Sequence, residues 1–230
     1  VVAGLGFVAQ IYGDFSGYTD IARGCARLLG YELPLNFLSP FLARSPREYY
    51  AKHWHLSLAS WVYDYLYFPL ALFLGRRLRY GVPLALLTTM LVMGLWHGFG
   101  WNYLAWGAYV GVLLTGGQLV WERWPRLFSG ALARLLTFHL VLCGLVIFRA
   151  ETIGDATAVL AALHGATQDL GPLPDVLWCV GVCVLLHLHA LLSERPMPKN
   201  PLVWYGVMVL LSTVAFSLGR SGTSFIYFQF

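Results

Sequence analysis

The sequence predicts an all-α integral membrane protein, a multi-helix transmembrane bundle with one re-entrant or interfacial segment. Of its 230 residues, 58% are hydrophobic and only 11% are charged, about half the charged fraction of an average soluble domain. The uncharged residues also occur in runs near the length of about 20 residues that a helix needs to cross a bilayer. This composition excludes disordered, collagen-like, coiled-coil and disulfide-scaffold proteins.

The first spans follow from these uncharged runs in chain order. Val1 to Gly13 is interpreted as the end of a first span, and Gly81 to Trp121 is long enough for two more. We expect the break between those two at Gly98 and Gly100, because glycine is a frequent helix breaker.

Three further spans are predicted in the second half of the chain. Leu135 to Phe148 is short, so it can cross only if its helix begins before Arg134 and that side chain extends to the interface. Val176 to Ser193 and Asn200 to Gly219 are uncharged runs close to the required length.

The aromatic segment Trp61 to Gly75 differs from these spans. It is short and rich in Tyr, Trp and Phe, and it contains the charged Asp64 and the helix-breaking Pro69. A segment of this kind is typical of re-entrant or interfacial structure, so we expect it not to cross the membrane.

The basic residues predict how the spans are oriented. If Trp61 to Gly75 does not cross, all of the 15 Lys and Arg residues except Arg149 and Arg220 lie on one side. By the positive-inside rule this side is cytoplasmic, which places His97 toward the outer end of its span. The net charge of +4 comes from such loop clusters, so we predict no nucleic-acid partner.

His97 is the first candidate for chemistry, because it stands at the expected break between two spans. A neutral imidazole can accept a proton near pH 7, and the neighbouring glycines allow a ligand or backbone to approach closely. The alternative is a histidine that only forms a hydrogen bond between helices. The spacing alone leaves both interpretations open.

A second pair of histidines, His53 and His55, flanks Trp54. In a helix, side chains two positions apart face different directions. Only one of the two is then expected to point inward, and His55, next to the apolar Leu56, is the better candidate. The alternative is an interfacial histidine among aromatic residues.

A metal site is not predicted. Cys179, Cys183 and His187 recur at every fourth residue, but one face of one helix cannot surround a tetrahedral ion and no second ligand cluster complements it. We therefore interpret them as packing residues. His139 and His164 have no partner in the sequence and are interpreted as structural.

Two carboxylates, Asp14 and Asp20, close the first span. They could cap a helix at the interface or order a site. The sequence contains no G-x-S-x-G element, phosphate-binding loop or dinucleotide fingerprint, so the soluble-enzyme chemistries of those motifs have no support.

Several stretches together carry a likeness to one family. They are DFSGYTD at 14–20, PLNF at 34–37, WHLSL at 54–58, GLWHG at 94–98 and FRAET at 148–152. In these motifs the chain resembles the membrane-bound O-acyltransferase (MBOAT) family, and within it the alginate O-acetyltransferase branch. The likeness covers nearly the whole chain.

The resemblance implies an MBOAT-like fold whose active site lies in a tunnel through the bilayer. Residues 1–230 would form the C-terminal part of such an acyltransferase domain, without its N-terminal helices. The near-invariant histidine of the family corresponds to His97 and the histidine of its W-H-x-S motif to His55. Both are therefore the expected catalytic residues, in a multi-pass protein of the bacterial cytoplasmic (inner) membrane.

The implied reaction moves an acetyl group from a cytoplasmic thioester toward hydroxyls of an exported polysaccharide such as alginate. The donor substrate would be acetyl-CoA or another acyl thioester, with no bound cofactor, and a periplasmic acetyl-carrier or polysaccharide-modifying protein could relay the group. His97 would act as general base, and His55 would orient the donor or polarise its carbonyl. Weaker candidates for substrate binding, with the basic ones attracting the donor phosphates, are Asn102, Asp14, Asp20, Arg44, Arg47 and Lys52.

Two alternatives remain. The first is transfer of D-alanyl or another acyl group to a cell-envelope polymer within the same family, although Ser16 and Asp20 favour the polysaccharide-acetylating branch. The second is an inactive half-length scaffold in an export complex. A transporter is disfavoured, because the sequence has no inverted repeats or paired broken helices.

The orientation can be tested with single cysteines at Arg79 and Gly100 in a background without other reactive thiols. We expect a membrane-impermeant thiol reagent to label Gly100→Cys in intact cells and to label Arg79→Cys only after the membrane is opened, because the basic clusters face the cytoplasm. Labelling of Arg79→Cys with protection of Gly100→Cys would show that the predicted topology is inverted.

Overall fold

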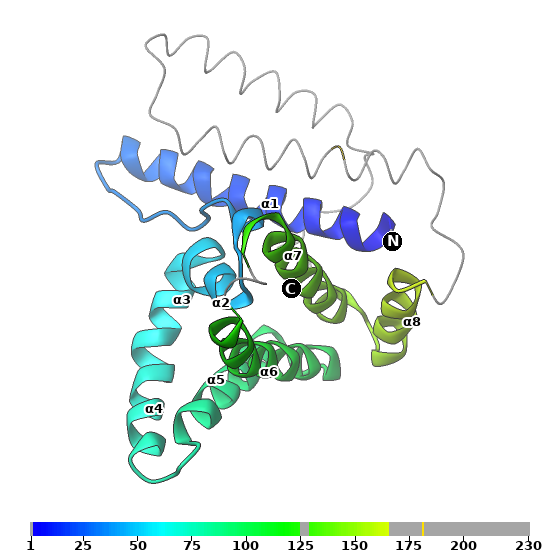
Figure 1. Cartoon of the computed structure of the whole chain (residues 1–230). Coiled ribbons are helices and arrows are strands. Elements are labelled where there is room, and N and C mark those ends of the chain that lie inside the picture. Colours follow the sequence, from blue (N-terminus) through cyan, green and yellow to red (C-terminus); the bar gives the residue numbers. More distant parts are fainter. Residues whose placement is uncertain (1, 125–128, 166–180, 182–230) are drawn as a thin grey trace. The chain divides into compact units, whose positions relative to one another are not determined.

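The computed structural model describes residues 2–124, 129–165 and 181, and apart from one isolated bridge its regular structure there is helical (Figure 1). The chain divides into two compact units. One comprises residues 34–169, and the other comprises residues 2–33 with 170–230. The spans predicted at Val176 to Ser193 and Asn200 to Gly219 lie outside the described residues, as do Cys179, Cys183 and His187.

In the second unit the described structure is the long helix α1 (Val2–Leu28). Gly30 ends it with a positive φ of 83°, and the amide of Tyr31 donates back to the carbonyl of Ala26 at 2.9 Å, the geometry of a glycine C-cap. Because α1 runs through residues 14–20, the helix continues beyond Gly13, and the position at which the span ends stays a prediction. The carboxylates there lie within a helix and cap neither end.

The first unit begins with a compact, mostly irregular segment. It contains η1 (Pro40–Leu42), the single-turn helix α2 (Pro46–Glu48) and the π-helical turn η2 (Tyr49–His53). Ser45 caps α2, because its hydroxyl accepts the Glu48 amide at 3.1 Å.

The aromatic segment forms one continuous helical path. The path consists of α3 (Leu56–Val62), the π-helical turn η3 (Tyr63–Tyr67) and α4 (Phe68–Gly75). Pro69 lies in the first turn of α4, where a missing amide is tolerated. Such a path is about 30 Å long at the usual helical rise, which would also reach across a bilayer. The interfacial placement of this segment stays a prediction.

The next two helices lie where the sequence predicts two spans. They are α5 (Gly81–His97) and α6 (Trp101–Arg123), and the break falls at residues 98–100 as expected. Helix α7 (Gly130–Arg149) begins before Arg134, which was the condition for a span there. Helix α8 (Ile153–Leu163) was not predicted.

By length and hydropathy, α7 is the one helix of the described part of the chain that meets the criteria for a membrane span. Helices α5 and α8 are apolar but have 17 and 11 residues. Helix α6 is 23 residues long but rich in Gly, Tyr and Trp. The all-α class is therefore confirmed for the residues that the structure describes, whereas the number of crossings stays a prediction.

Helices α5 and α6 pack backbone against backbone (Figure 1). A Cβ atom on Gly94 would overlap the carbonyl oxygen of Tyr103, and one on Gly107 would overlap that of Met90. Gly111 is similarly close to Leu87. Small residues spaced by four along one helix are the usual means of such close approach between membrane helices.

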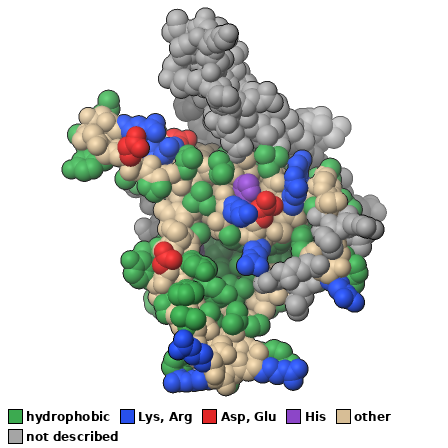
Figure 2. Space-filling model, turned by 60° about the vertical axis from the view of Figure 1, so that its left-hand side comes forward, with side chains coloured by type: hydrophobic (Ala, Val, Ile, Leu, Met, Phe, Trp, Pro, Cys, Tyr) green, Lys and Arg blue, Asp and Glu red, His purple; other side chains and the backbone are tan. Residues whose placement is uncertain are grey.

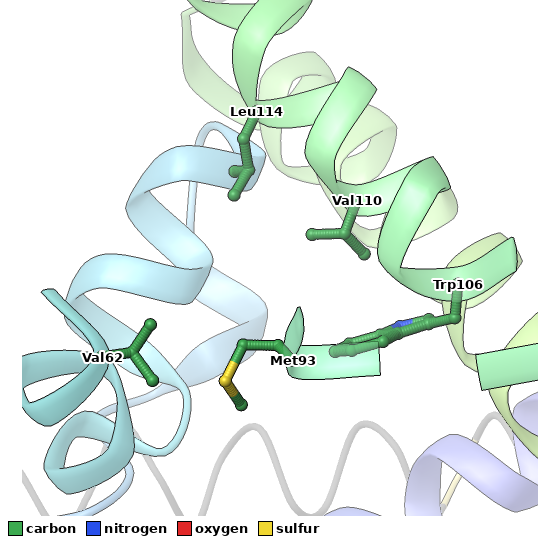
Figure 3. Packing of buried hydrophobic residues seen from close by; sticks show 5 residues of the cluster. All are labelled: Val62, Met93, Trp106, Val110 and Leu114. Atoms are coloured by element: carbon green, nitrogen blue, oxygen red, sulfur yellow. The ribbon is translucent and has the colours of Figure 1, made fainter. Parts of the chain in front are cut away.

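A cluster of buried side chains joins α3, α5 and α6. Figure 3 shows Trp106, Val110 and Leu114 along α6, with Met93 of α5 and Val62 of α3 facing them. Tyr50, Tyr109 and Phe148 pack against this cluster. The aromatic segment, the two central helices and the end of α7 therefore share one core.

The close contacts at these glycines predict that replacing one of them with alanine destabilises the protein. We expect Gly107→Ala to lower the free energy of unfolding by about 1–3 kcal/mol, because the new Cβ forces the backbones apart. Gly116→Ala on the same helix has open space around its Cβ and should be neutral or gain about 0.5–1 kcal/mol. Thermal unfolding of the purified protein in detergent measures both, and equal stability of the two variants would contradict the close packing.

Candidate functional site

His97 is the last residue of α5, and aromatic rings surround it. Its ring centroid lies 4.8 Å from that of Trp96, 5.3 Å from that of Trp106 and 5.0 Å from that of Phe148, each in an edge-to-face arrangement. Tyr103 stacks at 6.5 Å. The imidazole is thus held by rings from α5, α6 and α7, and it is half-buried.

Asn102 ties this group of rings together. Its side-chain amide nitrogen donates to the carbonyl oxygen of Phe148 at 3.2 Å, which connects the first turn of α6 to the end of α7. The Phe148 ring contacts His97, Tyr103 and Trp106. Asn102 therefore positions the ring that packs on His97.

His55 lies in a different local structure, where two extended segments pair. The Leu38 amide donates to the carbonyl of His53 at 3.0 Å, and the Leu56 amide donates to that of Asn36 at 2.9 Å. Phe37 and Trp54 form the antiparallel bridge between these bonds, and their rings meet edge to face at 4.9 Å. This pairing holds Trp54, the residue before His55, in an extended conformation between η2 and α3.

Asn36 holds His55 in one orientation. The oxygen Oδ1 of Asn36 accepts from His55 Nδ1 at 3.0 Å, from the Ser57 amide at 3.2 Å and from Ser57 Oγ at 2.9 Å. Because the Ser57 amide can only donate, the Asn36 atom is an oxygen, and His55 carries its proton on Nδ1. Burial lowers the pKa of the His55 imidazole to about 4, so the ring is neutral at physiological pH.

The backbone of His55 is also unusual. Its φ of 50° lies in the left-handed region, which is uncommon for a residue with a side chain. His55 is the N-cap of α3, and only Trp54 separates it from η2. Left-handed residues and π-helical turns of this kind cluster at functional sites.

The two predicted histidines lie in one neighbourhood. Phe148, whose ring contacts that of His97, packs against the same buried cluster as Val62, which lies in the helix that follows His55. His53 takes other partners: its Nδ1 contacts the Leu38 carbonyl oxygen and its Nε2 lies 3.9 Å from a Glu48 carboxylate oxygen. His53 and His55 therefore have different hydrogen-bond partners, although only one residue separates them.

Arg47 lines a cavity of about 170 Å³ between α2 and α6, together with Ser45, Pro46, Leu113, Leu114, Gly117 and Trp121. The indole of Trp121 donates to the Arg44 carbonyl at 2.9 Å and so fixes α2 beside α6. The side chains of Arg44, Arg47 and Lys52 are exposed. Figure 2 shows a hydrophobic hollow on one face, with Lys and Arg side chains near its edge.

The remaining predicted binding residues, Asp14 and Asp20, lie on α1 in the other compact unit. Asp20 is exposed and pairs with Arg23 one helical turn away at 3.1 Å. Their part in a site with the histidines stays a prediction.

Two findings go beyond the sequence analysis. The structure adds Asn36 to the site, where its Oδ1 accepts from His55 and Ser57; in the sequence it is only one residue of the motif PLNF. His139 and His164, interpreted from the sequence as structural residues, lie together in space: their Nε2 atoms are 3.1 Å apart, with Cys143 beside them.

Comparison with known proteins gives one family. The model of the membrane-bound O-acyltransferase family matches residues 3–145. Both candidate histidines, Asn36 and Asn102 fall within this range.

Several bacterial relatives are similar to the chain. A probable alginate O-acetylase of Pseudomonas putida is 38% identical over 168 residues, which are 73% of this chain and 33% of the relative. A peptidoglycan O-acetyltransferase of Helicobacter pylori is 33% identical over 166 residues, 70% of this chain and 31% of the relative. A teichoic acid D-alanyltransferase of Streptococcus thermophilus is 33% identical over 129 residues, 52% of this chain and 30% of the relative. The chain thus spans about a third of the length of these curated relatives.

The role of Asn36 can be tested through stability. Asn36→Ala leaves three donors without their acceptor, so we expect the free energy of unfolding to fall by about 1–3 kcal/mol. Asn36→Asp keeps an acceptor oxygen and should lose less, and Ser57→Ala, which removes one of the three bonds, serves as the matched control. If Asn36→Ala unfolds at the same temperature as Ser57→Ala, Asn36 does not organise this site.

Proposed function

Since the chain belongs to the membrane-bound O-acyltransferase family, we propose that it forms the histidine-bearing part of an enzyme that acetylates an exported polysaccharide. The acetyl group would come from a cytoplasmic thioester such as acetyl-CoA. It would reach hydroxyls of a polymer such as alginate, directly or through a periplasmic carrier. The observation that carries the proposal is that the elements next to His55 and His97 share one buried core, with each imidazole held by groups from other parts of the chain.

His97 acts as the general base in this proposal. The hydroxyl of the acceptor gives its proton to the His97 imidazole while its oxygen forms a bond to the thioester carbonyl carbon. The carbon–sulfur bond then breaks, and the leaving thiolate takes the proton from the imidazolium. Because the ring is fixed by contacts with Trp106 and Phe148, it needs no reorientation between the two proton transfers.

His55 has a different part. With its proton on Nδ1, bonded to Asn36, its Nε2 can accept a hydrogen bond but cannot donate one. A neutral ring in this tautomer cannot polarise the thioester carbonyl, which requires a donor. The geometry therefore favours the other role considered for His55, orientation of the acyl donor through one of the donor's own N–H or O–H groups.

The donor phosphates would be drawn to the exposed basic residues beside α2. Arg47 lines the cavity next to Trp121, and Arg44 and Lys52 lie in the same short segment. Clustered positive charge raises the local concentration of an anionic substrate. By the positive-inside rule this segment is cytoplasmic, the side on which a coenzyme A thioester is available.

Transfer of a D-alanyl group instead of acetyl is supported by one observation, the similarity to a teichoic acid D-alanyltransferase. This match covers 52% of the chain, against 73% for the alginate O-acetylase relative. We therefore propose acetyl transfer first. The protein would be a multi-pass protein of the bacterial cytoplasmic membrane in either case, with the lipid bilayer, the acyl donor and a periplasmic polysaccharide-modifying protein as partners.

The catalytic proposal predicts a large effect at one histidine. His97→Ala removes the base, so acyl transfer by the full-length protein should fall by about 10²- to 10⁴-fold while the protein still accumulates in the membrane. His55→Ala should impair transfer mainly through the apparent affinity for the donor. The measurement is the acetyl content of the polymer, with the protein level determined in parallel.

His187→Ala is the control for this experiment, because the sequence analysis interprets that histidine as a packing residue. It should leave polymer acetylation unchanged at equal protein level. Normal acetylation by a well-expressed His97→Ala variant would contradict the mechanism and favour an inactive scaffold.

A further inference from the structure

Three potential metal ligands converge between α7 and α8, away from the site described above. His139 and Cys143 lie one turn apart on the same face of α7, and His164 follows the last residue of α8. The ligand atoms of all three lie within 4.8 Å of one another. We propose that His139, Cys143 and His164 bind a zinc ion that fastens α8 to α7.

Two of the three ligand separations are close to those around a tetrahedral ion. The Nε2 atoms of His139 and His164 are 3.1 Å apart, and Cys143 Sγ is 3.8 Å from His139 Nε2. Zinc bonds of about 2.0–2.1 Å to nitrogen and 2.3 Å to sulfur, at tetrahedral angles, require separations of about 3.4 Å and 3.6 Å. These two separations need to change by only a few tenths of an ångström. The third, between Cys143 and His164, is within 4.8 Å, and a movement of the exposed His164 side chain would bring it to the tetrahedral value.

The orientation of His164 supports this assignment. Its Nδ1 contacts the carbonyl oxygen of Leu160 at 2.7 Å, and because a carbonyl can only accept, this nitrogen carries the proton. The lone pair of Nε2 then points toward His139 and Cys143. A histidine that ligates a metal usually donates its other ring N–H to a carbonyl or carboxylate in this way.

The local sequence explains why these ligands meet. Thr152 and Asp155 form a reciprocal capping box at the start of α8, with the Asp155 amide donating to Thr152 Oγ1 at 3.1 Å. This cap follows directly after α7 and turns the chain, so α8 packs back against α7. Eleven residues of helix then bring His164 to the level of His139 and Cys143.

The donor set selects the type of ion. Two imidazoles and one thiolate favour zinc over the oxygen-seeking magnesium and calcium. The thiolate neutralises one of the two positive charges of the ion, which lowers the cost of holding it in an apolar region. The fourth tetrahedral position is left for water or another donor.

The test measures zinc directly in the full-length protein, purified in detergent through an affinity tag that contains no histidine. We expect about one zinc ion per chain by elemental analysis. His139→Ala and Cys143→Ser should reduce it to background, while Cys25→Ser, a change of the exposed cysteine in the other unit, should retain it. Acyl transfer is not part of the readout, so the result is independent of the proposed function.

A second measurement leaves the three ligands in place, so it gives a result even if the ligand variants fail to fold. In a full-length protein whose other cysteines, including Cys25, Cys179 and Cys183, are all changed to Ser, Cys143 is the sole thiol. Cobalt(II) added to the metal-free form should produce a thiolate-to-metal absorption band together with the visible bands of a tetrahedral site. If the folded protein contains no zinc and gives no such band, or if zinc persists in His139→Ala and Cys143→Ser, the proposal is overturned.

Discussion

The close approach of α5 and α6 is the constraint on which the rest of the site depends. A side chain at Gly94 or Gly107 would collide with the backbone of the other helix, and the two helices would have to separate. The connection between them is only residues 98–100, so His97 cannot swing away from the start of α6. Because Gly94 and Gly107 have no side chains, the two helices approach closely and the His97 imidazole packs on the rings of Trp106 and Tyr103.

Asn36 supplies the corresponding constraint for the other histidine. One amide oxygen accepts three donors, two of them from Ser57 and one from His55, and Asn36 as a residue is only 9% exposed. Loss of such an acceptor leaves polar groups unsatisfied, which costs more than an average hydrogen bond contributes. The same oxygen also determines the tautomer of His55, so a residue that contacts no reacting atom in the proposed mechanism decides what His55 can do chemically.

The helices and candidate histidines could be predicted largely from local sequence. Glycines marked the break between α5 and α6, and the uncharged run before Arg149 marked α7. The site partners could not be predicted, because Asn36 lies 19 residues from His55 and His139 lies 25 residues from His164. Such contacts depend on the direction that the chain takes after a turn. The left-handed backbone of His55 sets this direction at the first contact, and the capping box of Thr152 and Asp155 sets it at the second. The helix α8 did have a local signal, Thr152 followed three residues later by Asp155.

Helix α7 carries residues of both sites, Phe148 beside His97 and the proposed zinc ligands His139 and Cys143. The two sites lie at different positions along its axis. At one end, the Phe148 carbonyl accepts from Asn102 and the Phe148 ring packs on His97. His139 lies nine residues earlier, about 13 Å along the helix axis. An ion bound there would be too far away to polarise a carbonyl beside His97. Its contribution would be to hold α7 from the side of α8 while Asn102 holds it from the side of α6. Anchoring a helix from both sides is a way to fix a ring contact to the sub-ångström tolerance that proton transfer requires.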